Sequence, residues 1–127
     1  MSETPENLKY AATHEWAKLE DANLVRVGIT DFAQSELGDI VFIGLPEVGR
    51  TVKQGEQCAV VESVKTASDL YSPVGGSVVA VNDSVADAPE QVNDAPYATW
   101  LFCVQAADPG ELDGLLDAAA YTAQIEA

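Results

Sequence analysis

The amino-acid sequence predicts a mainly β protein, a small barrel or sandwich with a few short helices. Many short β-branched segments follow one another at close spacing, and turns rich in glycine and proline separate them. The length of 127 residues suits one domain with a modest core, and a hydrophobic content of 47% is ordinary for a globular protein. We therefore expect a single domain over residues 1–127, with no linker and no internal repeat.

The first half of the chain predicts a strand, a helix and a second strand in close succession. Residues 24–29, LVRVGI, are β-branched and partly alternating, as expected for a strand. Thr30 or Asp31 can cap the short helix DFAQSEL, which Gly38 ends. A further strand is expected over 39–45, before a turn.

The second half of the chain repeats the pattern of short strands and ends in helical segments. Strands are expected over 50–54, 57–62, 67–71, 77–81 and 99–105. A long polar loop is expected between the last two of them. From Asp108 onward the pattern is helical in two short pieces, and Asp117 is a good cap for the second piece, AAAYTAQIEA.

The charge of the chain argues against several classes of partner. Acidic residues outnumber basic residues by 21 to 6, which gives a net charge of -15. A negative field of this size repels phosphate backbones and anionic membrane surfaces, so neither nucleic acid nor membrane is an expected partner. Basic patches on protein partners are favoured instead, although a salt-adapted host would also explain the charge. With no long apolar stretch and no targeting pattern at the N-terminus, we expect a cytoplasmic protein.

Metal and thiol chemistry find little support in the sequence. Cys58 and Cys103 are far apart and sit in apolar, strand-like segments, which favours buried free thiols over a disulfide. His14 is the only histidine, so a site with several histidine ligands is excluded. No serine or cysteine nucleophile stands in a recognisable motif beside His14, and we predict neither a metal site nor catalytic residues.

Lys65 stands between two apolar segments that predict the legs of a β-hairpin. Its ammonium should therefore project into water from the tip of the hairpin, where a modifying enzyme could reach it. Most surface lysines only solvate a face of the protein, and the spacing by itself does not single out Lys65.

The residues around Lys65, in contrast, single it out. Residues 60–76, VVESVKTASDLYSPVGG, resemble the lipoylation segment of the glycine cleavage H-protein family, with Lys65 at the acceptor position. Further blocks that match the family in order are Leu8-Lys9-Tyr10, His14-Glu15-Trp16, VGITDFAQSELGDIVFIGLPEVG, Pro89, Val92-Asn93, Pro96-Tyr97, Trp100-Leu101 and the tail near Tyr121. The sequence departs from the family pattern at Thr66, at Gln91 and in the segment 96–100, which is one residue short.

The resemblance implies a fold and a cofactor. The fold is a flattened antiparallel β barrel or sandwich of the lipoyl/biotinyl-carrier (hammerhead) type, with short edge helices and C-terminal helices. Lipoate would be attached covalently, as an amide on Lys65. Glu62, Ser63 and Val64 flank the acceptor in the hairpin and would be read by the lipoate-attaching enzymes.

The resemblance also implies a role without catalytic activity. Members of the family carry the aminomethyl group of decarboxylated glycine from glycine decarboxylase, the P-protein, to the aminomethyltransferase, the T-protein. Dihydrolipoamide dehydrogenase, the L-protein, then reoxidises the lipoyl group. Tethering keeps the cargo close to the next active site, and the cofactor supplies the chemistry. We expect this chain to act as a monomer in that cycle.

The cargo carries a charged amine and decomposes in water, so a carrier should shelter it in a cleft with a carboxylate. The family pattern places this cleft beside Thr13 and Glu15 of the N-terminal segment and beside Asp69, four residues past Lys65.

Four alternatives to this assignment follow from the sequence. A lipoyl-relay protein, which passes lipoate to other enzyme complexes, is the closest. A biotinyl domain would have methionines beside its lysine, where this chain has Val64 and Thr66. A lipoyl domain of a 2-oxo-acid dehydrogenase would be shorter and would lack the block 27–49. A Schiff-base enzyme would need Lys65 to be desolvated or to lie beside a cation, which a hairpin tip near Glu62 and Asp69 does not provide.

Overall fold

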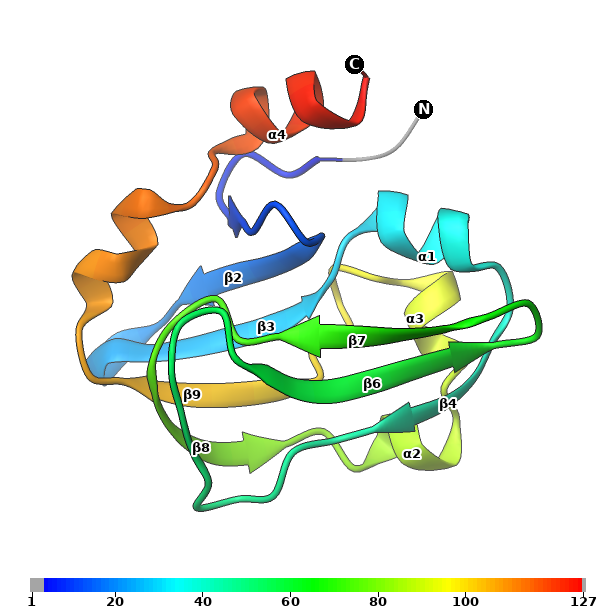
Figure 1. Cartoon of the computed structure of the whole chain (residues 1–127), viewed down its shortest axis with the longest axis horizontal. Helices are drawn as coiled ribbons and strands as arrows, with labels where there is room; N and C mark the ends of the chain where they lie inside the picture. The colour runs from blue at the N-terminus through cyan, green and yellow to red at the C-terminus, as the bar shows by residue number, and fades with distance from the viewer. Residues whose placement is uncertain (1–3, 127) are drawn as a thin grey trace.

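The computed structural model describes residues 4–126 of the chain, and these residues form two antiparallel β-sheets with short helices at their edges (Figure 1). One sheet has six strands in the order β1-β2-β3-β9-β8-β5, and the other has three in the order β4-β6-β7. The two sheets do not close into a continuous barrel. The predicted fold class, a flattened barrel or sandwich with short helices, is therefore confirmed.

The elements follow one another closely along the chain. The strands are β1 Lys9–Tyr10, β2 Glu15–Leu19, β3 Leu24–Ile29, β4 Ile40–Gly44, β5 Thr51–Val52, β6 Gln57–Ser63, β7 Ala67–Tyr71, β8 Gly76–Val81 and β9 Phe102–Ala106. The helices are η1 Asp21–Asn23, α1 Asp31–Leu37, α2 Ser84–Asp87, α3 Gln91–Asp94, η2 Pro109–Gly114 and α4 Ala118–Ile125.

The main hydrophobic core lies between the two sheets. Val25 and Val27 of β3 and Phe102 of β9 face inward from the six-stranded sheet, and each is 1% exposed or less. Val61 of β6 and Leu70 of β7 belong to the same cluster from the three-stranded sheet. The side-chain alternation that predicted β3 therefore reflects one face buried between the sheets.

A second, smaller core lies under the C-terminal helix α4. Leu8, Tyr10, Trp16 and Tyr121 form this cluster, and the Tyr10 and Tyr121 rings stack with centroids 4.7 Å apart. Backbone hydrogen bonds between Tyr10 and Leu116 tie β1 to the chain just before α4. The two ends of the described chain thus pack against each other on one side of the sheets (Figure 1).

Helix α1 has the cap and the end that its sequence predicts. Of the two candidate caps, Thr30 is the one used, because its side chain accepts a hydrogen bond from the Ala33 N–H. Gly38 ends the helix with a φ of +80°, a conformation that favours glycine. Asn93 of α3 then binds this end by accepting from the Ile40 N–H and donating to the Gly38 carbonyl.

Three parts of the sequence-based prediction of elements need correction. Strands β1 and β2 were not predicted, because β1 has only two residues and the EWAKL sequence of β2 does not alternate. The segment 82–98 is not only loop, since α2 and α3 lie within it. The strand expected over 50–54 covers only Thr51–Val52, β5.

Gln91 links α2 to α3 by donating to the Ser84 and Ala88 carbonyls, which gives this departure from the family pattern a structural role.

Residues 4–126 were searched for membrane-spanning helices and for groups of metal-binding side chains. No helix in that range is both long and apolar enough to cross a membrane. No three histidine, cysteine or acidic side chains in the same range are grouped to hold a metal ion. Cys58 and Cys103 are buried free thiols, as predicted.

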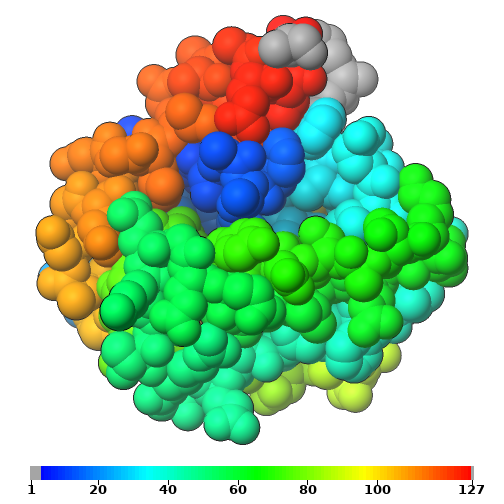
Figure 2. Space-filling model, viewed as in Figure 1, coloured from blue at the N-terminus to red at the C-terminus, as the bar shows by residue number. Residues whose placement is uncertain are grey.

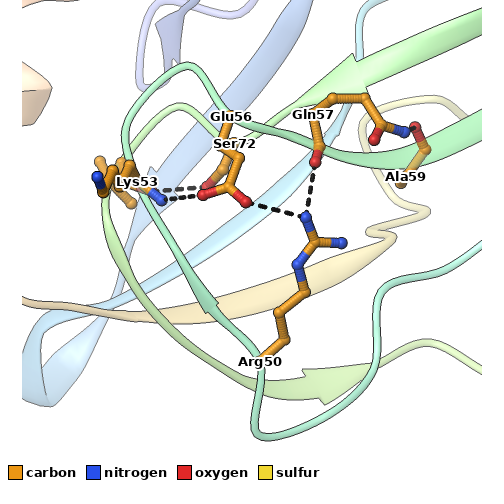
Figure 3. Close-up of polar contacts among 7 residues, drawn as sticks. Arg50, Lys53, Glu56, Gln57, Ala59 and Ser72 are labelled. Carbon is orange, nitrogen blue, oxygen red and sulfur yellow. Dashed lines mark hydrogen bonds and ion pairs between the residues drawn. The ribbon is translucent and has the colours of Figure 1, made fainter.

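The base of the β6–β7 hairpin is held by a polar cluster around Glu56 (Figure 3). The Glu56 carboxylate accepts from the Lys53 backbone N–H at 2.9 Å and from Arg50 Nη2 at 3.0 Å. Arg50 also donates to the Gln57 carbonyl, and the Ser72 N–H donates to the Glu56 carbonyl. The Glu56 carboxylate therefore ties together the turn before β6, and the Glu56 backbone carbonyl joins this turn to the end of β7.

The pKa of Glu56 lies below its ordinary value, first because the Lys53 N–H and then because the Arg50 guanidinium bind the charged form. A lowered pKa means that this group stabilises the fold above its unfolded pKa, and that the stabilisation disappears as the pH falls through the folded pKa. Glu56→Gln should therefore lower the urea midpoint near pH 7, and the difference from wild type should shrink toward about pH 4. Glu47→Gln, at an exposed carboxylate of the preceding loop between β4 and β5, serves as the control and should change neither value. A Glu56→Gln midpoint that matches wild type at both pH values would contradict this role.

Candidate functional site

The tip of the β6–β7 hairpin is the three residues Val64, Lys65 and Thr66. The Ser63 N–H donates to the Thr66 carbonyl at 2.7 Å, and the Ser63 hydroxyl accepts from the N–H groups of Lys65 and Thr66 at 3.2 Å. Ser63 therefore shapes the tip. Thr66 contributes its backbone to this turn while its side chain is exposed, so the departure from alanine concerns a side chain that does not close the turn.

The tip is also attached to the end of helix α1. The Val64 N–H donates to the Asp39 carbonyl at 3.0 Å. The aliphatic part of Lys65 lies over Gly38, where an added Cβ would stand 3.3 Å from Lys65 Cε. The Lys65 side chain thus extends over the backbone of Gly38, which has no side chain, and the Val64–Asp39 hydrogen bond holds the adjacent backbone in place.

The predicted flank residues Glu62, Ser63 and Val64 lie at this tip. Glu62 and Val64 are exposed, and Val64 is 68% exposed although it is apolar. Val41 and Phe42 of the neighbouring strand β4 are also about half exposed, at 55% and 49%. The surface around Lys65 therefore combines apolar side chains with carboxylates, a composition suited to recognition by another protein.

Two hollows lie side by side along the N-terminal segment that precedes β2. The first has a volume of about 230 Å³ and is lined by His14, Phe32 and Glu36 together with Ser68 and Leu70 of β7. The second has a volume of about 340 Å³ and is lined by Glu15, Tyr71 and Leu115, among others. Thr13 lines both hollows. Figure 2 shows the N-terminal segment, in blue, at the bottom of a depression between the hairpin, α1 and the C-terminal part of the chain.

Glu15 is the buried carboxyl of this region, with no exposed surface. Burial raises its pKa to about 7, against the opposing effect of hydrogen bonds from the Thr13 hydroxyl and the Tyr71 N–H. The Tyr71 bond to Glu15 Oε2 measures 3.1 Å and connects the N-terminal segment to the end of β7. The carboxyl is consequently charged above about pH 7 and neutral below it.

The structure brings two of the three predicted cleft residues together. Thr13 and Glu15 are hydrogen-bonded neighbours at the hollows. Asp69 is exposed and lines neither hollow, and strand alternation places it on the opposite face of β7 from Ser68 and Leu70.

Several lining residues were not found by sequence reasoning. Ser68 and Leu70 share one face of β7, a signal that strand alternation from Lys65 onward could have supplied. Phe32 and Glu36 are four residues apart on one face of α1 and point to the same hollow. His14 enters the hollow through a left-handed backbone conformation, φ 79°, which no local sequence signal predicts for histidine.

The chemistry of this region is suited to presenting an exposed lysine amine, not to catalysis. Lys65 is exposed and not enclosed by apolar residues, unlike the desolvated lysines that form Schiff bases. Both thiols are buried, and burial raises the pKa of Cys58 to about 12, so neither provides a nucleophilic thiolate. An exposed amine on a shaped hairpin tip, with hollows beside one leg, is suited to carry an acyl arm and to shelter its end.

Comparison with known proteins relates nearly the whole chain to one family. Residues 8–127 match the family model described as glycine cleavage H-protein. The chain is 55% identical over 127 residues to the glycine cleavage system H protein 2 of Pseudomonas aeruginosa, and the match covers 100% of this chain and 98% of that protein. It is 59% identical over 121 residues to the glycine cleavage system H protein of Methylococcus capsulatus, with 95% of each covered.

A solved structure supports the same relationship. The crystal structure of a glycine cleavage system H protein from Mycobacterium marinum superposes with a TM-score of 0.89 at 44% sequence identity. The match covers 97% of this chain and 99% of that one. By sequence, by fold and by the matched segment that contains Lys65, the chain belongs to the glycine cleavage H-protein family, whose members are non-catalytic lipoyl carriers.

Proposed function

We propose that this chain, a shuttle protein of the glycine cleavage system, carries its lipoyl group as an amide on Lys65. The observation that carries the proposal is the position of Lys65, exposed at the shaped tip of the hairpin within the segment that matches the family. The other lysines, Lys9, Lys18 and Lys53, lie on a short strand, on β2 and in a turn, and no comparable loop presents them.

The residues of the tip fit this group. Lipoate supplies a dithiolane that accepts the one-carbon cargo and is reoxidised afterwards. The protein supplies an amine in water, a turn closed by Ser63, and a bare surface at Gly38 along which the lengthened side chain can lie. We propose that the lipoate-attaching enzymes recognise Glu62, Ser63 and Val64, whose side chains or backbone define this tip.

The two hollows are the proposed shelter for the end of the arm. Ser68 and Leu70 lie three and five residues past Lys65, about 10 and 17 Å along an extended strand. Thr13 and the buried Glu15 lie next to them and would hold the charged amine of the cargo, because an ionised carboxylate in a poorly solvated site attracts an ammonium strongly. Asp69 would add negative charge at the edge of β7, outside the hollows.

The family assigns the partners. The P-, T- and L-proteins of the glycine cleavage system act on the carrier in turn, as that system implies. The lipoyl-relay alternative is not favoured, since the relatives that match over their full length are named glycine cleavage system H proteins. A monomeric state and a cytoplasmic location are parts of the proposal, and the bacterial relatives are consistent with that location.

The first test is the identity of the modified lysine. Lys65→Arg keeps the charge but removes the acceptor amine, so a lipoate-attaching enzyme should add no lipoyl mass to the intact variant. Lys53→Arg, at another turn, should be modified as wild type is. Lipoyl mass on the Lys65→Arg variant, or unmodified Lys53→Arg protein, would contradict the assignment. Both variants should share the thermal midpoint of wild type.

The second test concerns Glu15. Glu15→Gln keeps the shape but removes the charge; its amide oxygen can accept from the Tyr71 N–H, and its amide NH2 can donate to the Thr13 hydroxyl. Ammonia should therefore leave the loaded carrier about 10- to 100-fold faster above pH 7, the loss expected for one charge-assisted contact. Release is measured with no partner enzyme present. Asp69→Asn, which lies outside the hollows, should have a smaller effect.

The pH dependence provides an independent check of Glu15. Because burial raises the Glu15 pKa to about 7, the wild-type carboxyl becomes neutral as the pH falls through that value. The release rates of wild type and Glu15→Gln should therefore converge below about pH 6 and separate at about pH 8. Equal rates across this range would show that Glu15 does not hold the amine.

A further inference from the structure

A single hydroxyl group of the C-terminal helix joins two segments that line the first hollow. Tyr121 of α4 has no exposed surface. Its hydroxyl lies 2.8 Å from His14 Nδ1 and 2.7 Å from Thr30 Oγ1. His14 lines the hollow directly, and Thr30 is the N-cap of α1, which supplies Phe32 and Glu36 to the adjoining part of the lining.

The His14 ring needs a partner to stay in this position. Its backbone φ of 79° is uncommon for a residue with a Cβ, so the surrounding contacts must maintain it. The ring contacts Phe32, with centroids 5.1 Å apart, and the Tyr121 ring, at 5.7 Å. The Thr30 N–H donates to the His14 carbonyl at 3.1 Å, which joins the two segments a second time.

We propose that Tyr121 is a positioning residue for the arm shelter. Through its hydroxyl, α4 holds the His14 ring and the start of α1 together and thereby fixes where these two segments stand in the lining of the first hollow. This inference rests on the proposed function, because it assigns the hollow to the arm. It adds that the C-terminal helix, which contacts neither Lys65 nor the hairpin tip, controls how well the loaded arm is sheltered.

Both donor directions fit the heavy-atom positions, and we infer the one in which each hydroxyl proton has an acceptor. Thr30 Oγ1 already accepts from the Ala33 N–H, so its own proton is free to go to the Tyr121 hydroxyl. Tyr121 then donates to His14 Nδ1, which makes His14 neutral with its proton on Nε2. Burial lowers the pKa of His14, and the carboxylate of Glu36 on α1 partly raises it. The other ionisable groups near the ring are Glu15, its chain neighbour, and Tyr121 itself.

The chain offers a matched pair of variants for the test. Tyr121→Phe removes only the hydroxyl and keeps the stacked ring. Tyr10→Phe removes the hydroxyl of the other ring in the same stack, which donates to the Pro5 carbonyl and does not contact the hollow. Both variants are compared with wild type for thermal midpoint and for lipoyl mass, and both should be modified on Lys65.

The main readout uses the fact that His14 is the only histidine in the chain. Its imidazole resonances can be followed by NMR through a pH titration, with neither lipoate nor a partner enzyme present. Wild type should show the Nε2–H tautomer and a pKa below the ordinary histidine value. Tyr121→Phe should raise the His14 pKa and weaken the tautomer preference, because the neutral ring loses its hydrogen bond. Tyr10→Phe should change neither.

The second readout is the release of ammonia from the loaded carrier. Hydrolysis of the aminomethyl-sulfur bond consumes one water and yields the thiol, formaldehyde and ammonium. Tyr121→Phe should release ammonia about two- to tenfold faster than wild type, the effect of one buried hydrogen bond, while Tyr10→Phe should match wild type.

The outcomes separate this inference from the proposed function. An unchanged His14 titration in Tyr121→Phe, a release rate equal to wild type, or the same acceleration in both variants would overturn the positioning role. A wild-type carrier that releases ammonia as fast as a lipoylated peptide of the hairpin would contradict the arm shelter instead, while the His14 titration would still decide whether Tyr121 holds the ring. A wild-type His14 that is protonated on Nδ1 when neutral would overturn the inference without any variant.

Discussion

A carboxylate withdrawn from water joins the two sheets at the site. Glu15 begins β2 in the six-stranded sheet, and it accepts the N–H of Tyr71, at the end of β7 in the three-stranded sheet. Burying this charge is unfavourable, and the pKa rises to about 7 as a result. The bonds from Thr13 and Tyr71 offset part of that cost and hold the N-terminal segment against the hairpin. The two hollows exist because this segment lies there.

The hairpin that carries Lys65 is held at both of its ends. At the base, Glu56 binds Arg50 and the Lys53 N–H, and Ser72 closes the cluster. At the tip, Ser63 closes the turn and the Val64 N–H binds the Asp39 carbonyl. The loop that presents Lys65 is therefore held in place, and preorganisation of this kind lowers the entropic cost of docking to a partner.

The C-terminal helix contributes to both stability and the site. Its buried Tyr121 stacks on Tyr10 and closes the smaller core, and the same residue reaches His14 and Thr30 through its hydroxyl. A residue with two such functions couples the packing of the chain ends to the shape of the hollow. Under the proposal for Tyr121, changes in α4 alter the lining of the first hollow without any contact with Lys65.

The sequence by itself determined the elements that depend on local signals: β3 from its alternation, α1 from Thr30 and Gly38, and the hairpin with Lys65 at its tip. The family motifs added the fold type and the carrier role. Only the tertiary structure decided β1, which has two residues and exists through its pairing with β2, and the four-residue helices α2 and α3, which are too short to be stable alone. It also decided the hollows and the place of Asp69 outside them. The physical reason is that these contacts join residues far apart in the sequence. The hydroxyl of Tyr121 contacts His14 across 107 residues and Thr30 across 91, and local sequence patterns do not predict contacts that only tertiary packing creates.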